Sequence, residues 1–159
     1  MTIDINKGKG KYSVKDIMSF LLMQVDQKGV RISREKMTYL LFFAQGFYVY
    51  LNNTPLFSEE FQLKRNTIKL CGLNQIWLDL NLNLVQANSK NLKMEDQIFL
   101  MKVLNCIVHI EDDQLSRFVS NGTACRGAAE LGEGSYLLKK EIGLDARRLD
   151  QYASSRKYH

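Results

Sequence analysis

The sequence predicts a mainly α-helical domain with a small β-element of two or three strands. Its 159 residues suffice for one domain with its own core, and its single proline favours long, uninterrupted elements. Residues 33–51 place apolar side chains at helical spacing around the whole circumference of one helix. Two segments, 56–70 and 80–86, show instead the alternation of apolar and polar residues that is typical of short strands.

We expect a mobile basic arm over residues 1–12, followed by one domain over residues 13–155. Ser13 is suited to cap the first helix, with Asp16 in the place of the acidic residue of a capping box. This helix is expected to stop near Gly29. The short turn that follows leads directly into the next helix, so the two are expected to form an antiparallel pair.

The next helix is predicted to be the centre of the fold, with Ser33 as its N-cap. One apolar stripe is formed by Met37, Leu40, Leu41, Ala44, Phe47, Tyr48 and Leu51. The opposite face carries Tyr39, Phe42, Phe43, Gly46 and Tyr50. A glycine inside a helix costs about 1 kcal/mol relative to alanine. We therefore expect another backbone to pack closely against Gly46, and the helix to end before Pro55.

The remaining elements follow from the same periodicities. Residues 73–80 are predicted to be helical, and a short strand from Leu80 to Gln86 is expected to pair with the segment that contains Phe57, Phe61 and Leu63. A long helix is predicted from Lys93 to Ile110, and its inward residues are expected to be Met94, Ile98, Met101, Leu104, Ile107 and Val108. The last predicted elements are a helix over 112–120, a small Gly-rich stretch over 123–134 and two helical pieces over 135–143 and 144–154.

Composition bounds the classes of function. No apolar run approaches the roughly 20 residues that a membrane span needs, so we expect a cytoplasmic protein without a membrane partner. The three cysteines are far apart and show no zinc-binding spacing, which indicates a reducing compartment. The net charge of +5 is unevenly placed, with clusters at Lys7–Lys15, at Lys64, Arg65 and Lys69, and near the C-terminus. Such clusters form either a solvated surface or a surface for phosphate or an acidic partner.

Catalytic chemistry is not expected. His109 is predicted to lie on or beside the buried side of a helix, and His159 is terminal. Cys125 is followed by Arg126, which could lower the pKa of the thiol, but a small buried thiol is the simpler interpretation. The glycines at 127, 132 and 134 lack the Gly-Lys-Ser/Thr of a phosphate loop. We expect no enzyme, no cofactor and no metal site.

The first third of the chain resembles a known family. The residues that carry the resemblance are Tyr12-Ser13, Ile17, Leu21, Ile32-Ser33, Lys36-Met37, the run from Leu40 to Tyr48, Pro55-Leu56-Phe57 and Glu59-Glu60-Phe61. They are similar in order and spacing to the SocA-like, or Panacea, domain. After residue 63 the resemblance weakens, since the usual Trp-x-x-Gly-Pro-Val is replaced by Leu63-Lys64-Arg65-Asn66-Thr67-Ile68 and a later Trp by Cys125.

This resemblance implies a helical, non-catalytic antitoxin of bacteria, phages or prophages that binds a toxin protein and neutralises it. Lys36, Gln45, Gly46 and Glu60 match family positions and are expected to serve the framework or the interface. Our candidate partner-binding residues are Tyr39, Phe43, Tyr50, Lys64, Arg65 and Lys69. Two alternatives stay open: an anti-CRISPR-like inhibitor of a host defence nuclease, and a DNA-binding regulator that uses the basic arm.

Overall fold

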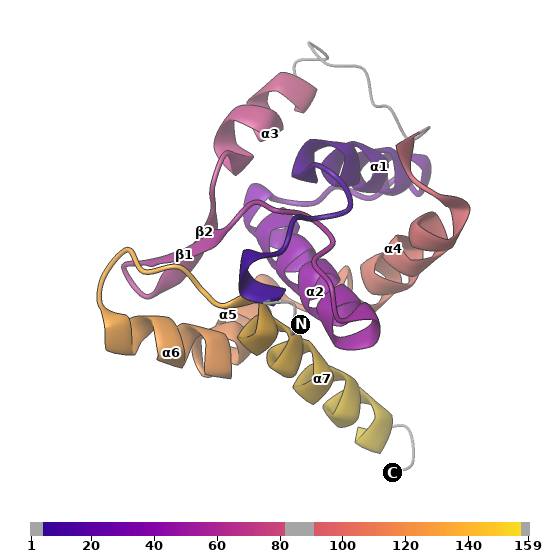
Figure 1. Ribbon diagram of the computed structural model, residues 1–159. Helices are drawn as coiled ribbons and strands as arrows, with labels where there is room; N and C mark the ends of the chain where they lie inside the picture. Colours follow the sequence, from indigo (N-terminus) through magenta and orange to yellow (C-terminus); the bar gives the residue numbers. More distant parts are fainter. Residues whose placement is uncertain (1–4, 82–90, 157–159) are drawn as a thin grey trace.

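The structure is a computed structural model that describes residues 5–81 and 91–156 (Figure 1). It is mainly helical with one small antiparallel sheet, as the sequence predicts. In chain order the elements are η1 (Ile5–Lys7), α1 (Val14–Gln27), α2 (Arg34–Asn52), β1 (Phe61–Lys64), β2 (Thr67–Leu70), α3 (Leu73–Asn81), α4 (Met94–Ile107), α5 (Asp112–Ser120), α6 (Thr123–Leu131) and α7 (Lys139–Arg156). Within the described ranges, no helix combines the length and the apolar character that crossing a bilayer requires.

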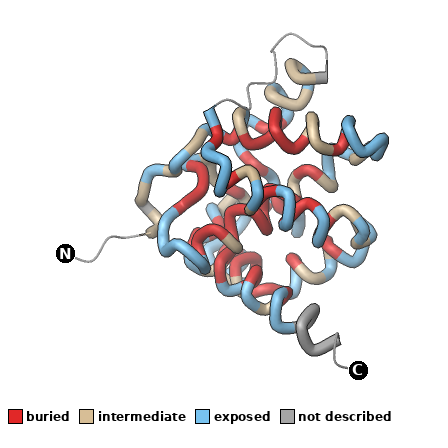
Figure 2. The backbone as a smooth tube through the Cα atoms, turned by 90° about the vertical axis from the view of Figure 1, so that its right-hand side faces the viewer, coloured by how far each residue is buried: buried red, intermediate tan, exposed pale blue. Residues whose placement is uncertain are grey.

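Helix α2 forms the centre of the core. Its N-cap is Ser33, whose hydroxyl accepts a hydrogen bond from the backbone N–H of Lys36, and its C-cap is Asn53 in the left-handed region. Both of its faces are buried, which confirms a helix covered on two sides (Figure 2). Only its two ends reach solvent, and in the last turn Leu51 is exposed although the apolar stripe predicts it inside.

Helix α7 is the element that lies alongside α2 (Figure 1). A Cβ at Gly46 would lie 2.6 Å from the backbone oxygen of Ile142 and 2.8 Å from the Cβ of Ala146. The expectation of a close backbone at this glycine is therefore confirmed. The sequence prediction of two helical pieces here is wrong, because α7 continues through Gly143, which also faces α2.

The pairing of α1 with α2 is also not as expected. Helix α1 crosses α2 and has its main helical neighbour in α4 (Figure 1). Its N-cap is Ser13, as predicted, and the Ser13 side chain accepts a hydrogen bond from the N–H of Asp16. The carboxylate of Glu59 also binds this end of the helix, by accepting a hydrogen bond from the N–H of Val14 at 2.9 Å. An apolar face shows that a helix is covered, but it does not say which neighbour covers it.

Residues 5–12 lie against the fold, in contrast to the mobile arm that composition suggested. Tyr12 donates a backbone hydrogen bond to the carbonyl of Leu56 at 2.9 Å, and its hydroxyl donates to Asp96 at 2.5 Å. The ammonium of Lys11 lies 2.8 Å from the same carboxylate. A Cβ at Gly10 would overlap the backbone of Phe57, so the chain passes here without room for a side chain.

The sheet differs from the predicted one. Strands β1 and β2 form a hairpin within residues 61–70, with Phe61 opposite Leu70 and Lys64 opposite Thr67. Leu80 and Asn81 belong to α3, and residues 82–86 of the predicted strand lie outside the described residues. The residues between the strands, Arg65 and Asn66, both have positive φ (50° and 64°), as in the tight turns of two-residue hairpins.

Helix α4 is rotated relative to the prediction. Leu104 and Ile107 face the core as expected, together with Leu100 and Val103. Exposed residues, in contrast, include three that the prediction placed inside: Met94, Ile98 and Met101. The first turn of α4 explains this orientation, because Asp96 is buried there to bind Lys11 and Tyr12.

Candidate functional site

The hairpin presents three cationic side chains to solvent, and we call Lys64, Arg65 and Lys69 the basic hairpin face. All three are exposed, whereas the alternate residues Leu63, Ile68 and Leu70 are buried in the core. Side chains of a strand alternate between its two faces. The apolar face therefore fixes the hairpin on the body, and the basic face points outward.

A third segment, residues 133–137, holds the hairpin at its outer edge (Figure 1). The N–H of Leu63 donates to Ser135 at 2.9 Å, and the N–H of Gly134 donates to Leu63 at 2.8 Å. At the turn, the N–H of Arg65 donates to the carboxylate of Glu133 at 2.7 Å. Strand β1 is thus bonded on both sides, which gives the basic hairpin face a defined position.

The cations of this face have no acidic partner among the described residues. The ion pairs there involve Lys11, Lys36 and Lys139, with Asp96, Asp112 and Glu60 as their nearest acids. The carboxylate of Glu133 lies at this turn, but it binds the backbone N–H of Arg65, and no described acid forms an ion pair with Lys64, Arg65 or Lys69. The surface is therefore available to an acidic partner.

Tyr50 is exposed on a second surface, where α2 and α7 lie side by side. Its side chain is 45% exposed, and the guanidinium of Arg147 lies 5.9 Å from the centroid of its ring. Leu144, one turn earlier on α7, is also exposed. Tyrosine and arginine are among the residue types enriched in protein-binding hot spots, so Tyr50 stays a candidate contact.

Tyr39 and Phe43 are not available to a partner, and their assignment to the surface is wrong. They are 4% and 0% exposed. The ring of Phe43 packs against Phe42 at 5.2 Å and against Phe118 of α5 at 5.9 Å. The second apolar face of α2 is covered from within the chain, by α5 and α7.

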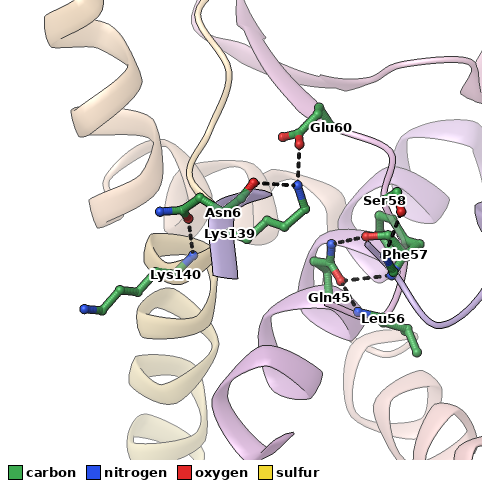
Figure 3. Close-up of polar contacts among 9 residues, drawn as sticks. Asn6, Gln45, Leu56, Phe57, Ser58, Glu60, Lys139 and Lys140 are labelled. Atoms are coloured by element: carbon green, nitrogen blue, oxygen red, sulfur yellow. Dashed lines mark hydrogen bonds and ion pairs between the residues drawn. The ribbon is translucent and has the colours of Figure 1, made fainter. Parts of the chain in front are cut away.

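Gln45 is a structural residue at the centre of the fold (Figure 3). It is fully buried, and its side-chain oxygen accepts hydrogen bonds from the N–H groups of Leu56 (2.8 Å) and Phe57 (3.3 Å). Its amide nitrogen donates to the carbonyl of Phe57 at 2.8 Å. A single side chain thus satisfies three backbone groups of the segment that leads to the hairpin.

The other family-matched residues also hold elements together. Lys36 pairs with Asp112 at 3.1 Å and donates to the carbonyl of Ile110, joining α2 to the start of α5. Glu60 pairs with the buried Lys139, which also donates to the carbonyl of Asn6 (Figure 3). With Gly46 against α7, all four have framework roles here.

The residues considered for catalysis are not brought into an activated arrangement. Burial raises the pKa of the Cys125 thiol to about 12, and the nearby Asp145 acts in the same direction. This is the opposite of the shift that a nucleophilic cysteine needs, and it agrees with the simpler interpretation of a buried thiol. His109 is exposed in the turn after α4, so its predicted burial is wrong. The described part of the chain contains no cluster of ligands that could hold a metal ion.

A buried acid at the start of α6 was not predicted from the sequence. Asp145 of α7 accepts hydrogen bonds from the N–H groups of Thr123 (2.8 Å) and Ala124 (3.2 Å). Burial nevertheless raises its pKa, while these two bonds act against that shift. Its partners lie more than 20 residues earlier in the chain, so no local pattern could have identified this cap.

Comparison of the chain with protein-family models, curated proteins and solved structures found no match. The resemblance to the SocA-like domain therefore stays a prediction from the sequence.

Proposed function

We propose that this protein is a non-catalytic, antitoxin-like inhibitor that binds a bacterial toxin directly and blocks it by occlusion. The observation that supports this proposal is the basic hairpin face, which combines a fixed backbone with three cations that form no ion pair in the described part of the chain. Complementary charge steers two proteins together and excludes partners of like charge. The surface fits a partner with an acidic patch.

The turn residue Arg65 strengthens the argument. Its φ of 50° lies in the left-handed region, where most residues with a Cβ are strained by about 1 kcal/mol or more. Glycine, asparagine and aspartate are the usual residues at such turn positions. An arginine here is a poor choice for folding alone, so we attribute it to a contact made by its guanidinium group.

A host defence nuclease is the alternative target. Carboxylates that hold catalytic metal ions make many nuclease sites acidic, and an exposed basic hairpin can contact such a site. The choice between toxin and nuclease rests on the partner that is recovered.

The DNA-binding alternative has less support. The arm on which it rests is tied to the fold, and Lys11 is engaged with Asp96. A regulator that bound phosphates would lose affinity steeply with salt. The absence of a DNA shift at low salt would remove this alternative.

The test is to purify the tagged protein from its native host, identify the partner and express that partner alone and together with the protein. We expect the partner to arrest growth and the protein to restore it. The variant Lys64→Glu/Arg65→Glu should lose both capture and rescue. The control Lys15→Glu/Arg31→Glu changes net charge equally at two exposed positions and should retain both. Equal capture by the two variants would refute the role of the hairpin.

A further inference from the structure

The exposed side of α4 carries an apolar stripe that no described part of the chain covers. Met94, Ile98 and Met101 recur at helical spacing and are 68%, 48% and 36% exposed. The opposite side of the same helix, with Leu100, Leu104 and Ile107, is buried in the core. Helix α4 lies at the edge of the molecule, on the side away from the hairpin (Figure 1). The stripe therefore forms a surface separate from the basic hairpin face.

Two opposite charges flank this stripe. Glu95 and Lys102 are both exposed and are spaced by about two helical turns, so they lie along the same flank of α4. Ile98 lies between them in the sequence. The side chain of Glu95 is 74% exposed and reaches Lys11 only at 3.8 Å, while Lys11 is held more closely by Asp96 at 2.8 Å. Lys102 takes part in no ion pair within the described residues.

We propose that α4 is a homodimerisation surface, on which two copies pack their helices antiparallel about a two-fold axis near Ile98. In an antiparallel pair, the flank of α4 that carries Glu95 and Lys102 lies beside the same flank of the second copy, which runs in the opposite direction. Glu95 then faces Lys102 of the second copy, and the two-fold axis repeats the pair. A parallel arrangement would bring opposite flanks together and lose both pairs, so the charge pattern selects the antiparallel one.

The size of the stripe sets the strength of the dimer. One exposed helix face is smaller than the interface of a typical permanent dimer, so the association is weak and depends on concentration. The basic hairpin face stays free in the dimer, since it lies on the other side of the molecule (Figure 1). A dimer would thus present two such faces to its partners.

Sedimentation equilibrium of the full chain tests the proposal at concentrations from about 1 µM to about 1 mM. The mass should rise from 18.4 kDa toward twice that value. Ile98→Glu should abolish the rise, whereas Leu131→Glu, at an exposed apolar position of α6, should not. Circular dichroism would verify that each variant is folded.

The charge pair provides a sharper test. Glu95→Lys alone and Lys102→Glu alone place like charges together twice in the dimer, and each should weaken association about tenfold. The double variant Glu95→Lys/Lys102→Glu restores opposite charges and should recover the wild-type affinity. A wild-type mass of 18.4 kDa at all concentrations would overturn the proposal. So would a dimer that ignores Ile98→Glu, or a double variant no tighter than the single ones.

Discussion

The contact between α2 and α7 at Gly46 leads to a quantitative prediction for the variant Gly46→Ala. Alanine gains about 1 kcal/mol of helix propensity over glycine. The new Cβ would, however, lie 2.6 Å from the backbone oxygen of Ile142, an atom that moves only if the helix moves. Overpacking of this kind costs about 1–3 kcal/mol. The gain in propensity therefore cannot be realised without separating the two helices.

Gly143→Ala is the matched control, since it lies in the partner helix of the same contact. Its Cβ would meet a side-chain atom, Val49 Cγ1, at 3.1 Å, and the nearest backbone atom at 3.6 Å. A side chain can turn away, so most of the propensity gain should remain. The difference between the two variants cancels propensity and isolates the backbone clash. We expect Gly46→Ala to be less stable than Gly143→Ala by about 1–3 kcal/mol.

Urea unfolding monitored by circular dichroism measures this difference. At the size of this chain, 1 kcal/mol corresponds to a shift of about 2–4 °C in the thermal midpoint, so melting gives an independent value. If Gly46→Ala is as stable as Gly143→Ala, α7 does not approach α2 as described. The assignment of α7 as the cover of α2 would then be refuted.

Four further predictions follow from single residues. Arg65→Asn should stabilise the fold by about 1 kcal/mol in urea unfolding, because asparagine tolerates the left-handed turn, and should weaken partner capture in the same assay as the hairpin variants. Gln45→Leu should destabilise by about 2 kcal/mol or more, because it leaves buried backbone groups of Leu56 and Phe57 without partners. The pKa of Glu141 is raised, mainly by burial and to a smaller extent by the neighbouring carboxylates of Asp145 and Glu130. Its charged form is therefore disfavoured in the folded state. Its contribution to stability is thus greatest below the ordinary pKa of 4.5 and is lost as the pH rises through the raised value. Glu141→Gln should accordingly be more stable than wild type at pH 7 by thermal melting, and the advantage should vanish below pH 4.5. The buried Cys125 should react with a thiol reagent only after unfolding, whereas the exposed Cys71 and Cys106 should react in the native protein.

The sequence was most informative where local chemistry determines the structure. Ser13 and Ser33 were identified as N-caps because a hydroxyl at the start of an apolar helix has one obvious role. Gly46 predicted a close backbone, since nothing else compensates a glycine in a helix interior. The end of the helix predicted over 112–120 is confirmed, because Asn121-Gly122 is a typical C-terminal pair. These features depend on neighbours within a few residues.

The hairpin was missed because its turn has unusual chemistry. Asn-Gly between two apolar runs is the strongest local sign of a two-residue turn, whereas this chain has Arg65-Asn66. The alternation of Leu80, Leu82 and Leu84 offered a competing strand, and Leu80 proved to be helical. The candidate site was predicted in part, since its three cationic side chains were expected at the surface. The strand pairing and the hydrogen bonds from residues 133–137 that fix the hairpin were not predicted, because they join segments far apart in the sequence.

Two sets of apolar residues were wrongly placed by the sequence, one on the surface and one in the core, and both errors have the same physical cause. An apolar helix face requires a cover, but periodicity does not tell whether that cover belongs to the same chain. For Tyr39 and Phe43 the cover is internal, since α5 and α7 close over them. Met94, Ile98 and Met101 are exposed and have no such cover among residues 5–81 and 91–156, because Asp96 turns the other side of α4 inward to bind Lys11 and Tyr12. The polar network at Asp96 thus decides which face of α4 is left for a second copy of the chain. Asp96→Asn should weaken that network and loosen the dimer without touching its interface.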